Sequence, residues 1–422
     1  MRVIKMVNVN DFCGKTDSDI IENAIKHKEA DGIVIIPPRK ADVEPERDFW
    51  LLDRAILLPE NTTVILQNCK LKLSDRCRDN FFRSANCGMG IEFPEKITNI
   101  HVRGEGLCVL EGADHPRATG DRTKTLHAPC PARAEDVCQM ADWIPAERRT
   151  PDKLQFMDIH GHTYGTDALN PEESQYGDWR GIGVLFANAE YFSISGLKIV
   201  NQHCWGISLE ACSKGRVEKI DFSVNKPRVI DGMYTNIENQ DGIDIRNGCH
   251  DIVISDITGR TGDDVVALTA IAGPDYKPGG SLENTHVMHN DWTKREADIH
   301  DIVIRNVVAH SQMCFAVRLL AARDSIYNVV VDGVIDTAGA GTTVLLGDGG
   351  IYGEEYPDSI RNTSVSNVVC NSNTAVKVSG YVSDSVISNI VNQKPGGSAV
   401  SVVNENYLKN VTTDNLVTVA KQ

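Results

Sequence analysis

Aromatic residues, basic blocks and long apolar runs are all scarce in this chain of 422 residues. Aromatics make up 6% of the sequence, and 43 lysines and arginines stand against 58 aspartates and glutamates, for a formal net charge of −15. Because no Lys/Arg-rich block is present to neutralise phosphates, we expect no nucleic-acid partner. Because no apolar run is long enough to cross a bilayer, we expect no membrane partner either.

The N-terminus also lacks the apolar segment that directs a chain to secretion. The twelve cysteines are scattered and do not show the regular spacing of small disulfide-stapled scaffolds. In a chain of this length they are expected to be reduced and buried rather than bridged. Together these features predict a cytoplasmic protein.

Glycine, by contrast, is frequent at 34 residues, and valine, isoleucine and asparagine recur in short runs. This composition favours many short strands joined by tight turns. One amphipathic helix is predicted over residues 16–28, where a Thr/Asp cap precedes apolar residues at helical spacing. A buried strand that two prolines terminate follows at residues 32–38.

From about residue 181 onward, two strand patterns return in alternation. The first appears as "YFSISGLKIV" at 191, "DIVISDITGR" at 251 and "DSVISNIVNQ" at 384, and the second as "DGIDIR" at 241, "DVVALT" at 264 and "FAVRLL" at 315. A repeat of 22–26 residues with two or three short strands per turn is typical of a parallel solenoid. We therefore predict an all-β protein, a right-handed parallel β-helix formed by residues 1–422 as one domain, with the 16–28 helix capping its N-terminal end.

Residues 111–180 interrupt this rhythm with a polar stretch that is rich in Pro, Arg, His and Trp. A loop of that length is usually functional or disordered. We predict that it forms a wall over one face of the solenoid, with Trp179 offering a ring to a sugar and Arg180 folding back over the cleft. A simple salt bridge is the alternative role for Arg180.

Acidic residues gather where two neighbouring repeats begin. When Ile243 is aligned with Val266, Asp241 falls one coil, 23 residues, below Asp264. Adjacent strands lie about 4.8 Å apart, so these two carboxylates would be neighbours. Asp263 would lie beside them, and Asp244, on the same strand as Asp241, would point outward. Like charges in contact cost energy that a catalytic site or a metal would recover. Glycoside hydrolysis needs such a cluster, with one acid to protonate and another group to activate water.

These residues also carry a resemblance to a known family. "NQDGIDI" at 239 and "GDDVVAL" at 262 resemble the Asn-Thr-Asp and Asp-Asp motifs of the polygalacturonase-like glycoside hydrolases, family 28. "DGIVIIPPRK" at 31 and "NQHCWGISLEAC" at 201 are similar to other segments of that family. The resemblance implies an inverting hydrolase without a cofactor or metal ion. Asp263 would be its general acid, Asp241 and Asp264 would hold and deprotonate water, and Asn239 and Asp244 would contact the sugar.

The chain departs from the family at two motifs. The family's Gly-His-Gly motif is expected where Gln312-Met313-Cys314 stand, with a displaced His310 nearby, and its Arg-Ile-Lys motif is matched at best by Arg318-Leu319-Leu320. In the family these groups help to bind a galacturonate carboxylate. Their loss makes galacturonan a weaker candidate substrate, while hydrolysis is affected less. We expect exo-action on short plant-type or pectin-derived oligosaccharides, because a cytoplasmic enzyme would meet imported fragments and the 111–180 insertion could close one end of the cleft.

Two histidines in an insertion after the Asp-Asp strand, His286 and His289, are further candidates for a sugar subsite or for the missing histidine. Solvated loop histidines are an equally open interpretation. Two other functions also remain open: a β-helix lyase, uronan epimerase or fructan-cyclising transferase, and a glycan-binding solenoid without catalysis. The sequence leaves undetermined the sugar, its linkage and the oligomeric state.

Overall fold

The structure, a computed structural model, describes most of the chain. The described residues are 6–29, 32–40, 46–75, 77, 79–88, 91, 93–114, 178–230, 233–235, 237, 239–271, 286–288, 297–338, 341–347, 349–350 and 355–420. The predicted wall, residues 111–180, therefore lies outside the described residues except at its two ends. His289 and the side chain of Arg180 lie outside them as well.

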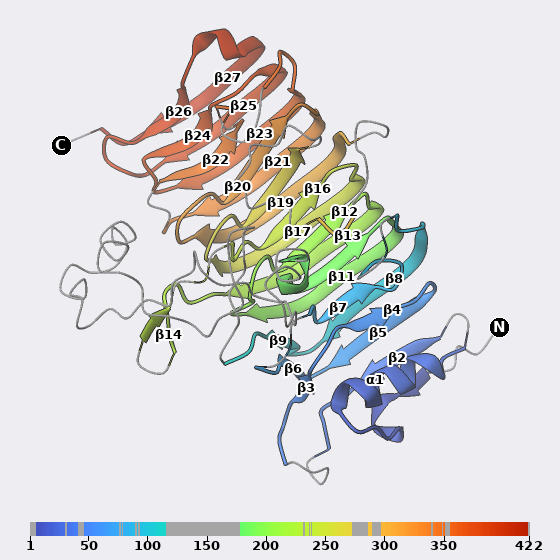
Figure 1. Cartoon of the computed structure of the whole chain (residues 1–422). Helices are drawn as coiled ribbons and strands as arrows, with labels where there is room; N and C mark the ends of the chain where they lie inside the picture. Colours follow the sequence, from blue (N-terminus) through green and yellow to red (C-terminus); the bar gives the residue numbers. More distant parts are fainter. Residues whose placement is uncertain are drawn as a thin grey trace.

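Two long parallel sheets run side by side along the molecule (Figure 1). The 15-stranded sheet contains, in spatial order, β1 (Met6–Asn8), β2 (Ile33–Ile36), β5 (Thr62–Gln67), β8 (Ile97–Glu105), β11 (Ala189–Val200), β13 (Ser213–Ser223), β17 (His250–Thr261), β19 (Ile299–Ser311), β21 (Ile326–Asp336), β23 (Ile360–Cys370), β25 (Val382–Asn392) and β27 (Leu408–Thr418), with β3 (Trp50–Leu52), β6 (Lys70–Leu73) and β9 (Val109–Glu111) beside this path. The 10-stranded sheet contains β4 (Ile56–Leu58), β7 (Phe82–Ser84), β10 (Val184–Ala187), β12 (Ile207–Glu210), β16 (Ile243–Arg246), β18 (Val266–Ile271), β20 (Val317–Ala322), β22 (Thr342–Leu346), β24 (Thr374–Val378) and β26 (Ser398–Val402). A separate antiparallel ribbon pairs β14 (Arg228–Ile230) with β15 (Met233–Thr235).

Strands of the two large sheets alternate along the chain, so each coil contributes one strand to each sheet from β10 onward. This is the predicted all-β, parallel β-helix. Ile243 pairs with Val266 and Ile360 with Val382, so these coils take 23 and 22 residues, as the repeat predicts. The coil from His250 to His300 takes 50 residues because it carries an extra segment after β18.

The strands of the 15-stranded sheet bend at residues with left-handed backbone. Asn306, Asn367 and Asn389 have φ angles of 56°, 56° and 55°, a conformation that asparagine tolerates. In the coil between the first two, Gly333 takes the position of Asn306 with a φ of 76°, and the preceding residue, Asp332, is not left-handed. Asp332 Oδ1 instead accepts a hydrogen bond of 2.7 Å from Asn367 Nδ2 in the next coil.

The core lies between the sheets and is filled by the inward apolar positions of the repeat. The four positions used for the alignment, Ile243, Ile245, Val266 and Leu268, are each 0% exposed, which confirms their predicted orientation. The ten cysteines that the structure describes form no disulfide, and eight of them are buried. Buried thiols therefore fill core positions, as expected for reduced cysteines.

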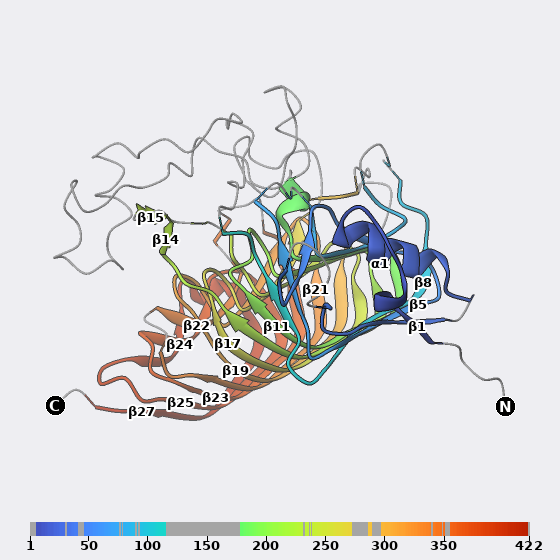
Figure 2. The same ribbon diagram turned by 90° about the horizontal axis from the view of Figure 1, so that it is seen from below.

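The predicted cap is the helix α1 (Asp17–Lys26), which covers the N-terminal end of the β-helix (Figures 1 and 2). Thr16 and Asp19 form a capping box at its start, and its apolar face is buried, including Ile21 at 0% exposure. Among the described residues, no helix is both long and apolar enough to span a bilayer.

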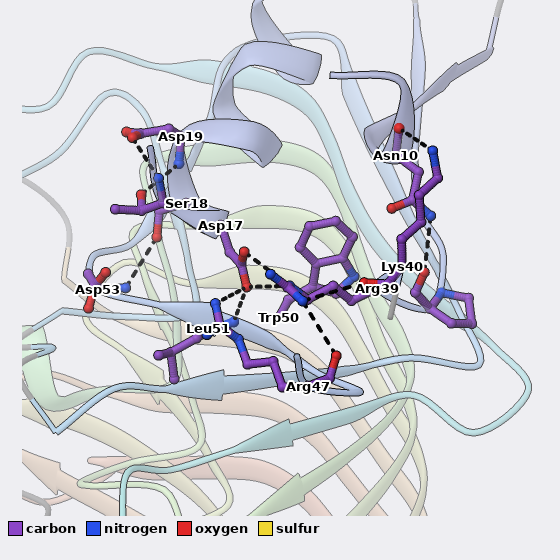
Figure 3. Close-up of polar contacts among 12 residues, drawn as sticks. Asn10, Asp17, Ser18, Asp19, Arg39, Lys40, Arg47, Trp50, Leu51 and Asp53 are labelled. Carbon is purple, nitrogen blue, oxygen red and sulfur yellow. Dashed lines mark hydrogen bonds and ion pairs between the residues drawn. The ribbon is translucent and has the colours of Figure 1, made fainter. Parts of the chain in front are cut away.

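The buried carboxylate of Asp17 ties α1 to the first coils (Figure 3). It accepts hydrogen bonds from Arg39 Nε at 3.1 Å, from Arg47 Nη2 at 2.8 Å and from the backbone of Leu51 at 2.8 Å. A buried carboxylate needs partners of this kind, so the network fixes the helix against the sheet.

Candidate active site

The predicted register of the acidic residues is confirmed by the backbone. Gly242 N donates to Asp264 O at 2.8 Å, and Ile243 N donates to Val265 O at 2.9 Å. The parallel ladder between β16 and β18 thus extends beyond the strands to the residues that precede them. Asp241 and Asp264 consequently hold equivalent positions in neighbouring coils.

Gly242 allows this close approach of the two chains. A Cβ atom at this position would lie 2.4 Å from Val265 O, well inside van der Waals contact. Three residues earlier, Asn239 adopts a left-handed φ of 52°, which turns the chain into the site. The sequence Asn-Gln-Asp-Gly therefore has a local structural reason as well as a chemical one.

Gln240 and Gln202 fix the backbone beneath the acids. Gln240 is 0% exposed and donates from Nε2 to Gln202 O at 2.6 Å, while Gln202 Nε2 donates to Asp241 O at 2.9 Å. Asp263 N in turn donates to Gln240 O at 3.2 Å. The glutamine that replaces the threonine of the family motif thus holds the loops that carry Asp241 and Asp263, a role that sequence reasoning did not assign.

A pocket of about 50 Å³ opens between these loops and the outer face of the 10-stranded sheet. One water needs roughly 10–15 Å³ on this measure, so the pocket has room for a few water molecules. Its lining comprises Trp205, Asn239, Asp241, Asp244, Asp263, Asp264, Ala267, Thr269, Arg318 and Leu320. Six of the predicted site residues therefore meet at one pocket: four aspartates, Asn239 and Arg318.

Burial and mutual repulsion raise the pKa values of the two registered acids. The pKa of Asp264 rises to about 7 because the carboxyl is buried, although Arg318 Nη1 at 3.4 Å and Phe315 N at 2.9 Å oppose the rise. The pKa of Asp241 also lies well above its usual value, first because of burial and then because of the nearby Asp263 charge. Groups that interact this closely titrate as a unit.

Asp244 adds a third buried carboxyl to the pocket. Its register neighbour is Ala267, whose next neighbour is Arg318, so Asp244 and Arg318 point to the same outer face of the sheet. Burial raises the pKa of Asp244, while Arg246 opposes the rise. The structure thus confirms the predicted outward direction of Asp244, although the residue is only 2% exposed.

Two buried oxygens in the pocket have no partner among the described residues. Asp241 Oδ1 and Asp244 Oδ2 accept no hydrogen bond there, although their residues are only 6% and 2% exposed. Leaving such atoms unpaired costs free energy. Their presence at a pocket lining is typical of a site that binds a polar ligand.

Asp263 is less deeply buried than Asp241 and Asp264. Its Oδ1 accepts from Asp264 N at 3.0 Å, and its backbone oxygen accepts from Thr261 Oγ1. Cys314 lies opposite in the next coil, and one ligand atom from each of Asp263, Asp264 and Cys314 lies within 4.8 Å of the others. Burial, followed by the charges of the two aspartates, raises the pKa of the Cys314 thiol.

Three predicted contact residues lie outside the pocket lining. Trp179 is 3% exposed and packs with Arg83, whose guanidinium lies 4.9 Å from its ring centre, so its ring belongs to a packed cluster. His310 is on β19 in the other sheet, paired in register with Arg260. His286 bonds through Nδ1 to Glu210 Oε1 at 2.8 Å and through Nε2 to Arg246 Nη2 at 2.6 Å.

The buried Glu210, at the end of β12, links His286 to the 10-stranded sheet. Burial alone would raise the pKa of Glu210, but His286, Arg246 and the Val287 amide together hold it below its usual value. Because the guanidinium of Arg246 can only donate, His286 accepts at Nε2 and carries its proton at Nδ1. His286 therefore anchors its segment next to the pocket rather than reaching into it.

Trp205 is the principal lining residue that sequence reasoning missed. It is 3% exposed, lies under the guanidinium of Arg246 at 4.6 Å and occupies the position of Asp241 one coil earlier. The signal was available, because aligning "WGISLE" at 205 with "DGIDIR" at 241 places the tryptophan directly beside the aspartate.

Neither the protein-family models nor the curated proteins include a match to this chain. Solved structures do match. The polygalacturonase of Erwinia carotovora ssp. carotovora has a TM-score of 0.57 at 12% identity, covering 98% of this chain and 97% of that one. An exopolygalacturonase from Thermotoga maritima gives 0.54 at 17%, covering 98% and 92%. The A-module of a mannuronan C-5 epimerase from Azotobacter vinelandii gives 0.50 at 13%, covering 99% and 98%.

Proposed function

We propose that this protein, which has a polygalacturonase-like β-helix fold, is a glycoside hydrolase that cleaves an oligosaccharide with inversion at the anomeric carbon. The observation that carries the proposal is the meeting of Asp241, Asp263 and Asp264 at one pocket on this fold. Hydrolysis of a glycosidic bond needs one group to protonate the leaving oxygen and another to activate water, and these three carboxyls supply both.

Asp263 is the general acid in this proposal. It is the most accessible of the three, so it can reach the oxygen of a sugar placed over the pocket. Asp241 and Asp264 hold a water molecule between them and remove its proton. Their raised pKa values make the ionised form of the pair a stronger base than an ordinary aspartate.

The spacing of the acids makes the product configuration the deciding measurement. Oxygen atoms of Asp263 and Asp264 lie within 4.8 Å. Most inverting enzymes separate acid and base by roughly 6.5–9.5 Å, whereas retaining enzymes use roughly 5–5.5 Å. Inversion here therefore requires Asp241 and Asp264 to hold the attacking water on the face of the sugar opposite Asp263.

The charge of the pocket favours a neutral sugar. Four aspartates line it, and Arg318, the cation among its lining residues, already pairs with Asp264 at 3.4 Å. A galacturonate carboxylate placed there would be repelled by those of the four aspartates that are ionised. We therefore assign the activity to the ends of short plant-type or pectin-derived oligosaccharides. A cytoplasmic location, where imported fragments would be met, belongs to the same proposal.

Epimerisation or elimination on a uronan is the second candidate, because the Azotobacter epimerase module shares the fold over 99% of this chain. Such chemistry abstracts a proton next to a carboxylate and needs a cation or donors to hold that carboxylate. The described pocket has one cation for four acids, which favours hydrolysis.

The test is an incubation with a panel of neutral and acidic oligosaccharides, with products followed by NMR from the first minutes. The expected result is a new reducing end whose first anomer has inverted configuration, formed about 10²–10⁴-fold more slowly by Asp263→Asn. A product with an unsaturated sugar, detected by ultraviolet absorbance, establishes elimination instead. A product epimerised without bond cleavage establishes the epimerase.

A further inference from the structure

We propose that Asp263, Asp264 and Cys314 form a binding site for a thiophilic divalent cation such as Zn²⁺, which blocks the carboxylates when it binds. Binding of this ion is a property separate from the proposed hydrolysis, and it can be measured without any glycan. It would make the protein sensitive to such cations whatever its substrate is.

The β-helix brings the three ligands together by register. Val266 pairs with Val317, so Cys314 occupies in its coil the position of Asp263 in the coil before. The turn that carries the thiol is held by Cys314 N, which donates to Ser311 Oγ at 2.7 Å. One oxygen of each aspartate and the sulfur all lie within 4.8 Å of one another.

The neighbouring carboxyls provide an independent reason to expect a cation. Asp241 Oδ1 and Asp244 Oδ2 are buried oxygens without a hydrogen-bond partner among the described residues, and both residues line the same pocket as Asp263 and Asp264. The pairing of Arg318 with Asp264 offsets one of these four acidic groups. A divalent cation bound in this pocket would relieve the remaining repulsion among its carboxylates.

The ligand set selects the kind of cation. Zn²⁺ accepts mixed sulfur and oxygen ligands at about 2.3 Å and about 2.0–2.2 Å, so the three ligand atoms, which lie within 4.8 Å of one another, would close in around a bound ion. Ca²⁺ and Mg²⁺ prefer oxygen ligands alone and gain nothing from Cys314. Sulfur binds as thiolate, so the Cys314 proton passes to solvent as the S–Zn bond forms.

A bound ion and catalysis would exclude each other. The Asp263 oxygen that coordinates the ion has no proton to deliver to a leaving group, and the Asp264 oxygen that coordinates the ion is no longer available to activate water. Zn²⁺ therefore acts as a competitor of the substrate on the proposed mechanism.

Isothermal calorimetry with ZnCl₂, on the full chain without glycan, tests the site. Wild type is expected to bind one ion per chain in the micromolar range. Cys314→Ala should weaken that affinity at least about tenfold, the scale on which lost metal-site groups act. Cys13→Ala is the matched control, because Cys13 is an exposed thiol away from the pocket, and it should leave binding unchanged.

Two further measurements keep the result decisive. Cd²⁺ should produce an ultraviolet thiolate charge-transfer band in wild type and in Cys13→Ala but not in Cys314→Ala. If Cys314→Ala does not fold, as judged by thermal unfolding, Asp263→Asn takes its place and should also weaken Zn²⁺ binding about tenfold or more. Equal Zn²⁺ binding by the folded pocket variants, binding lost in Cys13→Ala, or tighter Ca²⁺ than Zn²⁺ binding would each overturn the proposal. None of these outcomes depends on whether a glycan is cleaved.

Discussion

Asp241 and Asp264 stand one above the other in adjacent coils, joined by the 2.8 Å hydrogen bond from Gly242 N to Asp264 O. Both are buried, at 6% and 2% exposure, and both have raised pKa values. Two carboxyls placed like this share protons and a common water site more readily than either would alone. The first two predictions follow from this relationship.

Replacing either member of the pair should abolish most activity, and replacing both should add little. Asp241→Asn and Asp264→Asn are each expected to lower kcat by about 10²–10⁴-fold, the usual contribution of a general base. The double variant should be little slower than the slower single variant, because the two act on one water. The measurement is a double-mutant cycle on kcat, and strictly additive losses would contradict a shared water.

The raised pKa of Asp264 also makes a prediction for stability. Folding raises this pKa from 3.8 to about 7, so between these values the folded state keeps a proton that the unfolded chain has released. The free energy of unfolding should therefore fall as pH rises from about 4 to about 7. Asp264→Asn removes this penalty and should raise Tm at pH 8 by roughly one to a few degrees.

Thermal unfolding of wild type and Asp264→Asn across this pH range measures the effect. The control is Asp414→Asn, which removes one charge at an exposed position on the last strand, β27. A gain in Tm at pH 8 that is equal in both variants would reflect net charge instead of the pocket.

The fold and the acidic cluster were predictable because both follow from a local repeat. Inward isoleucine and valine positions recur once per coil, so aligning Ile243 with Val266 is enough to place Asp241 beside Asp264. Parallel register then dictates which side chains meet, without knowledge of the rest of the chain.

The surroundings of the cluster were less predictable because they come from distant segments. Trp179 is packed under Arg83, and its backbone oxygen accepts from Asn80 Nδ2 at a separation of 99 residues. His286 bonds to Glu210, 76 residues earlier in the chain. Both lie in or beside insertions that break the period, so alignment of repeats carries no information about their partners.

Polygalacturonate should be a poor substrate for this protein. Its repeating carboxylates would enter a pocket lined by four aspartates, where Arg318 is engaged with Asp264. We expect reducing-sugar release from polygalacturonate at least about tenfold slower than from the best neutral oligosaccharide, since one unfavourable charge contact of about 1.4 kcal/mol has that effect. Rapid depolymerisation would show that residues beyond the described pocket bind the carboxylates.

Asp263→Asn should lose activity in a manner that depends on the leaving group. A sugar alcohol is a poor leaving group and needs a proton in the transition state, so hydrolysis of natural oligosaccharides should slow by about 10²–10⁴-fold. An activated aryl glycoside leaves as a stable phenolate, so its hydrolysis needs little help from an acid and should slow far less. Asn keeps the size of Asp and can still accept the hydrogen bond from Asp264 N that now measures 3.0 Å, so the local fold should persist.

The measurement is kcat/KM for a series of aryl glycosides of decreasing leaving-group pKa, in wild type and in the variant. A steeper dependence on leaving-group pKa in Asp263→Asn than in wild type identifies Asp263 as the acid, whereas parallel slopes would transfer that role to another carboxyl of the pocket.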